Sequence, residues 1–268
     1  MPDAPNPTSV TTPHISHNAD ITPAKKNKNE TNKRETGTPC PSPLLAVSAQ
    51  AFLLASRRAD EATTQFEATK AKAETGDAQA QCNLGDCYLL GRGVAGDDVE
   101  AVKWYRQAAE QNDASAQESL GDCYFLGQGV AKDDVEAVRW YRQAAEQNDA
   151  SAQESLGNCY VDGRGVARDD VEAVKWYRQA AEQNDASAQL MLGNCYEYGV
   201  GVAKDYVQAY KWYNLAAARG ETGAIYKRDS IAGSMTPNQI AEGQRLSAIN
   251  RTAAAEKAKH SKDNAASP

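Results

Sequence analysis

Histidine is scarce in this sequence and absent from its central part. The three histidines are His14, His17 and His260, near the two ends of the 268-residue chain. Without histidine, the centre lacks the base that Ser-His and Cys-His catalysis requires. It also lacks the commonest nitrogen ligand of zinc sites. We therefore predict no catalytic residues, no metal site and no cofactor.

A surplus of basic residues is also missing. The formal net charge is −7, and residues 77–220 contain 23 acidic against 13 basic residues. Nucleic acids and anionic lipid surfaces are bound through clusters of lysine and arginine. The charge balance therefore argues against both kinds of partner.

Long apolar runs are absent too. The most apolar segment is Leu44–Ala55, and the mean hydropathy of the chain is −0.66. A membrane-spanning helix needs about 20 apolar residues, so we predict no membrane span. The segment also begins too late for an ordinary signal peptide. We predict a cytoplasmic protein. The alternative is export, with a secreted or periplasmic product and a long basic leader before a cleaved signal.

The cysteines do not form a framework of pairs. Four of the six recur at one position of a period: Cys87, Cys123, Cys159 and Cys195. The period supplies no second cysteine for each of them. Cys82 precedes Cys87 by five residues, about 500° of rotation on one helix, so the two lie apart around its axis. We interpret the cysteines as reduced, buried apolar residues.

What the chain does contain is an internal repeat. Residues 113–148 and 149–184 differ at only six of 36 positions. The differences are Asp122/Asn158, Phe125/Val161, Leu126/Asp162, Gln128/Arg164, Lys132/Arg168 and Arg139/Lys175. Residues 77–112 and 185–220 continue the same register. A fixed period of this length predicts a solenoid, in which each unit packs on its neighbours.

Each repeat predicts a helix, a turn and a second helix. The apolar stripe of the first helix is Ala116, Leu120, Cys123, Tyr124 and Gly127. Gly121 allows another helix to approach, and Gly127 and Gly129 end the first helix. Asp133 caps the second helix, followed by Glu136. The apolar set of the second helix is Val135, Ala137, Val138, Trp140, Tyr141, Ala144 and Ala145.

Two local motifs that could suggest a functional site are explained by helix ends and helix caps. The turns of the Gly127–Gly129 type follow helices, and they lack the lysine and the strand of a phosphate loop. Pairs such as Asp133 and Asp134 are explained by capping and by favourable charge at a helix N-terminus.

The pattern A-x3-LG-x2-Y-x2-G-x-GV-x2-D-x3-A-x2-WY-x2-A-A resembles the Sel-one-like repeat (SLR) family, a branch of the tetratricopeptide superfamily. The resemblance covers Asp77–Gly220. It implies an all-α, right-handed α-solenoid of helix-turn-helix repeats and a role as adaptor or scaffold. A cysteine-rich branch resembles penicillin-binding or weak β-lactamase proteins, but it carries two cysteines per repeat, against one here.

The ends of the chain differ from the repeats. We predict a disordered tail over residues 1–43 and a capping helix with a degenerate half-repeat over 44–76, where Phe66 and Ala73 match repeat positions. A C-terminal half-repeat and capping helix follow over 221–252, with Thr236 as N-cap and Pro237 in the first helical position. Residues 253–268 are predicted to be a second disordered tail. The fourth repeat departs mildly, since Leu215–Ala218 replaces Gln-Ala-Ala-Glu.

Residues of the first helices that do not belong to the apolar stripe are the candidate binding residues. By analogy with tetratricopeptide solenoids, they line the concave side. The set is Asn83, Asp86, Leu90, Ser119, Asp122, Leu126, Ser155, Asn158, Asp162, Met191, Asn194 and Tyr198. We predict that a protein or peptide partner binds along this groove. The alternatives are a hydrolase similar to the cysteine-rich branch, or an exported effector or surface protein with the same binding fold.

Overall fold

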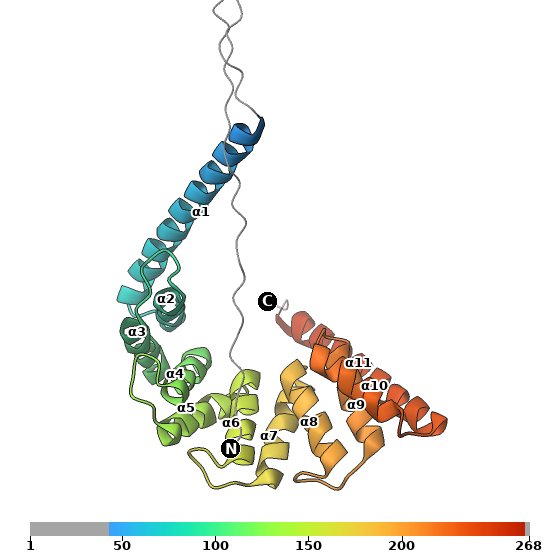
Figure 1. The fold of residues 1–268 in the computed structure, drawn as a ribbon. Coiled ribbons are helices and arrows are strands. Elements are labelled where there is room, and N and C mark those ends of the chain that lie inside the picture. Colours follow the sequence, from blue (N-terminus) through green and yellow to red (C-terminus); the bar gives the residue numbers. More distant parts are fainter. Residues whose placement is uncertain (1–42, 266–268) are drawn as a thin grey trace, which may run out of the picture. The chain divides into compact units, whose positions relative to one another are not determined.

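The computed structural model describes residues 43–265, and the regular elements within this range are helices (Figure 1). They are α1 (Pro43–Glu74), α2 (Ala78–Leu90), α3 (Asp98–Glu110), α4 (Ala114–Leu126), α5 (Asp134–Glu146), α6 (Ala150–Asp162), α7 (Asp170–Glu182), α8 (Ala186–Tyr198), α9 (Tyr206–Ala217), α10 (Thr222–Ala232) and α11 (Pro237–Ala265). The predicted N-terminal tail lies outside the described residues, apart from Pro43. Residues from Ser48 onward form one compact unit, which is described below.

The helices pack in the order of the sequence. Within a repeat, α2 packs on α3, α4 on α5, α6 on α7, and α8 on α9. Between repeats, α3 packs on α4, α5 on α6, and α7 on α8, while α10 and α11 both pack on α9. The prediction of an all-α solenoid with a 36-residue period is confirmed.

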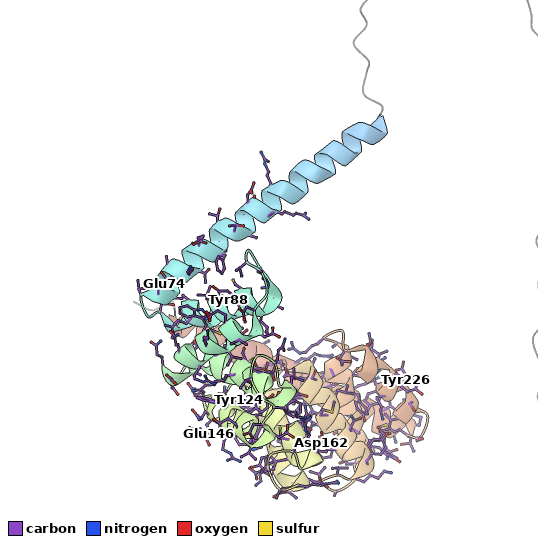
Figure 2. The ribbon with its side chains drawn as sticks, turned by 60° about the vertical axis from the view of Figure 1, so that its left-hand side comes forward. Glu74, Tyr88, Tyr124, Glu146, Asp162 and Tyr226 are labelled. Carbon is purple, nitrogen blue, oxygen red and sulfur yellow. The ribbon has the colours of Figure 1, made fainter. Side chains whose placement is uncertain are left out.

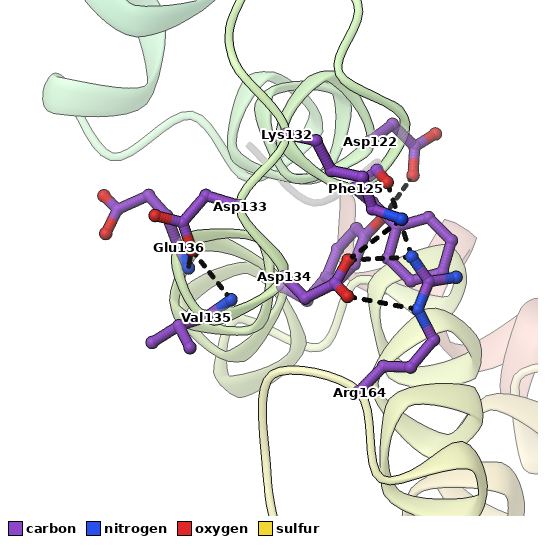
Figure 3. Close-up of polar contacts among 9 residues, drawn as sticks. Asp122, Phe125, Lys132, Asp133, Asp134, Val135, Glu136 and Arg164 are labelled. Carbon is purple, nitrogen blue, oxygen red and sulfur yellow. Dashed lines mark hydrogen bonds and ion pairs between the residues drawn. The ribbon is translucent and has the colours of Figure 1, made fainter.

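Aspartates begin both helices of a repeat. Asp113 accepts a hydrogen bond from the backbone N–H of Ala116 at 2.8 Å before α4. Asp133 accepts from the backbone N–H groups of Val135 and Glu136, both at 3.0 Å, before α5 (Figure 3). These bonds satisfy N–H groups that have no partner inside the helix. The predicted capping role of Asp133 is confirmed, and the capping role of Asp113 was not predicted from the sequence.

A tyrosine ring fills the gap that a glycine leaves between the two helices of a repeat. Leu120 and Ala116 are fully buried, as predicted. A Cβ atom on Gly121 would lie 2.6 Å from the ring of Tyr141, so only glycine admits this close approach. The prediction that Val135 belongs to the packed apolar set of the second helix is wrong. Its side chain is exposed, because it lies in the first turn of α5, and the buried stripe begins at Ala137.

The second glycine of each turn is where neighbouring repeats meet. Gly129 has a φ of +68°, and a Cβ atom there would overlap the carbonyl oxygen of Asp98 in the preceding repeat. Gly165 meets Asp134 in the same way. The sequence predicts a helix end at these glycines. In the structure only Gly127 caps the helix, with a φ of +74°, and Gly129 is a stacking contact.

Additional helices pack at both ends of the repeats. Phe66 and Ala73 of α1 are buried against Ala80 and Leu84 of α2. At the other end, α11 begins at Pro237, as predicted. Thr236 Oγ1 accepts from the backbone N–H of Gln239 at 3.3 Å, and Gln239 Oε1 accepts from the Thr236 N–H at 2.8 Å.

The predicted start of the C-terminal tail at residue 253 is wrong, because α11 continues to Ala265. Its last turns consist largely of alanine, lysine and glutamate. These residues have high intrinsic helix propensity and can extend a helix without a packing partner.

Candidate protein-binding face

The candidate binding residues lie on one surface formed by α2, α4, α6 and α8, here called the first-helix face. Three hollows in this surface are lined by nine of the twelve predicted residues. They are Asn83, Asp86, Asp122, Leu126, Ser155, Asn158, Met191, Asn194 and Tyr198. Leu90, Ser119 and Asp162 do not line these three hollows. Leu90 and Asp162 are exposed in the last turns of α2 and α6, and Figure 2 labels Asp162.

The first hollow lies between α1 and α2 and has a volume of about 680 Å³. Asn83 and Asp86 line it from α2, and Phe66 lines it from α1. Because α1 takes the place of a preceding repeat here, the N-terminal half-repeat contributes one wall. The sequence pattern of the full repeats does not predict that contribution.

The second hollow, of about 210 Å³, lies between α4, α5 and α6. Asp122 and Leu126 line it from α4, and Ser155 and Asn158 line it from α6. Leu126 has an exposed fraction of 66%, which leaves most of this leucine available to a partner.

Four of the predicted binding residues also have a structural role. Asp86, Asp122, Asn158 and Asn194 accept hydrogen bonds from the hydroxyl groups of Tyr105, Tyr141, Tyr177 and Tyr213 at 2.7, 2.6, 2.6 and 2.8 Å. Each bond joins the two helices of one repeat. The prediction that these side chains point away from the packed helices is therefore wrong for this position. Asparagine supplies the same acceptor oxygen as aspartate, which explains why both residues occur there.

The third hollow is the most apolar of the three and has a volume of about 300 Å³. Met191, Asn194 and Tyr198 line it from α8, and Val161 and Val200 also contribute. Tyr198 is exposed, so its ring forms an accessible rim.

Lys227 of α10 also lines the third hollow and was not predicted from the sequence. Its Nζ donates a hydrogen bond to the Tyr198 hydroxyl at 2.5 Å and lies 3.4 Å from Glu197 Oε2. The bond to Tyr198 and the nearby Glu197 raise the pKa of Lys227, so the ammonium form is favoured. Helix α10, which follows the fourth repeat, thus places a fixed cation beside an apolar hollow.

Two half-buried carboxylates, Glu118 and Glu154, lie one repeat apart and were also missed. Burial, together with the nearby carboxylates of Asp122, Asp149 and Asp86, raises the pKa of Glu118 to about 8. Burial also raises the pKa of Glu154, although a hydrogen bond from Asn158 at 2.8 Å opposes the shift. The spacing of four residues between Glu118 and Asp122 is the sequence signal for this proximity.

Arg164 links the second and third repeats (Figure 3). Its guanidinium donates to Asp134 at 2.7 and 3.4 Å and lies 3.5 Å from the ring centroid of Phe125. The hydrogen bonds from Arg164 lower the pKa of Asp134. In the preceding junction, Gln128 donates to Asp98 at 3.4 Å. Two of the six differences between the near-identical repeats, Phe125/Val161 and Gln128/Arg164, therefore affect the contacts between stacked repeats.

The described cysteines are unpaired thiols, namely Cys82, Cys87, Cys123, Cys159 and Cys195. Burial raises the pKa of Cys123 to about 12 and that of Cys159 to about 11, which keeps both thiols protonated and unreactive. Cys40 lies outside the described residues. Within residues 43–265, no three His, Cys, Asp or Glu side chains are grouped as ligands for a metal ion. No described helix combines the length and apolarity needed to span a membrane.

Comparison with known families identifies the repeat. The family model described as Sel1 repeat matches residues 78–113, 114–149, 150–185 and 186–221. The chain belongs to the Sel1 repeat family. The four matches follow the predicted repeats with an offset of one residue.

Solved structures of Sel1 repeat proteins are similar to this chain. A protective antigen present in uropathogenic Escherichia coli strains is 34% identical, with a TM-score of 0.67. The match covers 76% of this chain and 44% of that one, so the present chain spans less than half of the antigen's length. A Sel1 repeat protein from Oxalobacter formigenes is 37% identical over 69% of this chain and 76% of that one, with a TM-score of 0.60. A search of the curated proteins found no match.

Proposed function

We propose that this Sel1 repeat protein is a scaffold or adaptor that binds a protein partner along its first-helix face. The observation that carries this proposal is the row of three hollows, which are lined by corresponding positions of successive repeats. Repeat solenoids commonly use such extended surfaces for protein binding. The exposed side chains of Leu126 and Tyr198 supply apolar anchors at the second and third hollows.

The charges of this face favour a partner segment of mixed character. Asp122 lines the second hollow, and Glu118 and Glu154 interact with Asp122 and Asn158, which line it. A cation bound there would favour the ionised form of Glu118, whose pKa is otherwise raised, and the third hollow is largely apolar. A segment with a cationic side chain followed by an apolar one would match both regions. Charge complementarity of this kind contributes to specificity and to the association rate.

A matched pair of variants tests the proposal. Leu126 on α4 and Val135 on α5 have equal exposed fractions, 66%, but they belong to the first and second helix of the repeat. A partner recovered by affinity purification is titrated against Leu126→Ala, Tyr198→Ala and Val135→Ala. We expect each first-helix variant to lose about 2 kcal/mol of binding free energy, as at other interface hot spots, and Val135→Ala to bind as wild type does. The reverse pattern would assign binding to the second helices.

The alternatives are tested separately. A hydrolase similar to the cysteine-rich branch would contain disulfide bridges or turn over a β-lactam, and we propose that this chain does neither. We also propose a cytoplasmic location. An exported protein would use the same binding face. Detection of the chain outside the cytoplasm would therefore contradict the proposed location but not the proposed binding mode.

A further inference from the structure

Rings of three carboxamides close the junctions between repeats. At the junction of the first and second repeats, Gln147 Nε2 donates to Gln117 Oε1 at 2.7 Å. Asn112 Nδ2 donates to Gln147 Oε1 at 3.0 Å, and Gln117 Nε2 donates to Asn112 Oδ1 at 3.4 Å. Asn148, Gln153 and Gln183 form the same ring one repeat later, with distances of 2.8, 3.0 and 3.4 Å. In both rings the glutamine at the end of the second helix is held by one donor and one acceptor.

The junction of the third and fourth repeats keeps two members of the ring and replaces the third. Asn184 and Gln189 are present, but Arg219 stands where the ring requires glutamine. Gln189 Nε2 still donates to the carbonyl of Ala181 at 3.0 Å. Its Oε1 has no hydrogen-bond partner among the described residues, although Gln189 has an exposed fraction of only 1%. A buried acceptor without a partner is costly.

The backbone at residue 219 has kept the geometry of the other repeats. The Arg219 N–H donates to the carbonyl of Ala216 at 3.0 Å, as the Gln147 N–H does to Ala144 at 3.0 Å. The following residue, Gly220, has a φ of +89°, and its counterpart Asn148 has a φ of +70°. The side chain of a glutamine at position 219 would therefore leave the backbone in the same local geometry as the side chain of Gln147. The change from glutamine to arginine removes the carboxamide without moving the chain.

A hollow of about 580 Å³ lies beside the incomplete ring, between α7, α8, α9 and α11. Asn184 and Gln189 both line this terminal hollow, together with Lys211 and Asn250. Trp212 and Leu215 add apolar surface. Leu215 replaces a second glutamine, since its counterpart Gln179 accepts from Gln153 Nε2 at 3.3 Å in the third repeat. The volume lies within the usual range for ligand sites, roughly 300–1,000 Å³.

We propose that the terminal hollow binds the primary carboxamide of a ligand. Gln189 Oε1 is covered, so the side chains over it must move aside before the ligand N–H donates to it. The ligand carbonyl oxygen accepts from Asn184 Nδ2, as the third glutamine does in the two intact rings. A carboxylate fits less well, because it has no hydrogen to offer Gln189. The volume exceeds one side chain, so a glutamine or asparagine within a peptide fills it better than a free amide. This site is separate from the first-helix face.

The proposal is tested with two variants of residue 219 in the full chain. Arg219→Gln supplies the missing carboxamide from within the protein, whereas Arg219→Ala removes the arginine and leaves the hollow open. The probes are acetyl-glutamine-N-methylamide, its glutamate counterpart and propionamide, followed through the side-chain amide resonances of Asn184 and Gln189. We expect the glutamine probe to bind the wild type and Arg219→Ala equally. Binding to Arg219→Gln should be about tenfold weaker or more, which is the effect of one buried hydrogen bond.

Other measurements complete the test. Arg219→Gln should raise Tm by about 2–4 °C, because the buried acceptor gains a partner. Equal binding of propionamide and the glutamine probe would assign the hollow to small amides, and preference for the glutamine probe would assign it to a peptide. Three outcomes would overturn the proposal: equal binding of the glutamate probe, unchanged binding by Arg219→Gln, or no response to either amide, which would mean that water alone fills the hollow.

Discussion

The second and third repeats differ at six of 36 positions, and the structure shows that some of these differences are matched across a junction. Phe125 of the second repeat contacts Arg164 of the third. One repeat later, valines occupy both places, and Val161 and Val200 line the same hollow. An aromatic residue thus faces a cation at one junction, and two aliphatic residues take their places at the next. At this pair of positions, therefore, the repeats differ in both residues that face each other across a junction.

The backbone contact at the same junctions does not vary. Gly165 meets the carbonyl of Asp134, and Gly201 meets that of Asp170, whatever side chain precedes the glycine. Stacking therefore combines a constant backbone contact with a variable side-chain contact. Substitutions at Gly165 and at Arg164 change the two parts separately.

The largest effect is expected for the constant contact. Gly165→Ala places a methyl group against Asp134 and imposes a positive φ on alanine. We expect a loss of about 3 kcal/mol or more in the free energy of unfolding, from the left-handed backbone and the overpacking together. Gly163→Ala is the control, because Gly163 has nearly the same φ and no comparable contact. It should lose about 1–2 kcal/mol. Equal losses in urea unfolding would show that stacking does not depend on this contact.

The next largest loss of stability is expected at Asp122, whose counterpart in the third repeat is Asn158. Asp122→Ala leaves the Tyr141 hydroxyl without its acceptor, so we expect a loss of about 1–3 kcal/mol in urea unfolding. Asp122→Asn keeps an acceptor oxygen, as Asn158 does, and should lose much less. Asp162→Ala, at an exposed position, should change stability by about 0.5 kcal/mol or less. A large loss for Asp122→Asn would mean that the negative charge is needed.

Glu118 should make stability depend on pH. Its pKa is about 8 in the folded protein and lies near 4.5 in the unfolded chain, so the folded state binds the proton more tightly. This contribution is fully present below about pH 4.5 and is lost as the pH rises through 8. Between pH 6 and 8, the wild type should lose about 2 kcal/mol more than Glu118→Gln. Thermal melts across this range measure the difference, with Glu146→Gln as the exposed control. Parallel curves for wild type and Glu118→Gln would show that the Glu118 pKa is not raised.

Much of this architecture follows from the sequence, because the signals are local. Asp133 caps a helix within three residues, and Gly121 lies in a repeated apolar stripe. The binding face was predicted less well, because hydrogen-bond partners are not local. Asp122 appears free in the sequence, yet its partner Tyr141 lies 19 residues away. Lys227 belongs to a helix outside the repeats, so the repeat pattern could not connect it with Tyr198.

The smallest effect concerns the variable contact between Phe125 and Arg164. Arg164→Val copies the next junction at one residue only, and it removes both the ion pair with Asp134 and the contact with the Phe125 ring. We expect a loss of about 0.5–1 kcal/mol, because the side chains are partly exposed and such contacts are weak there. Phe125→Val, Arg164→Val and the double variant form a cycle whose coupling energy isolates the pair. If the residues act together, the double variant, which copies both valines, loses less than the sum of the single variants. Strict additivity in urea unfolding would mean that the two positions changed independently.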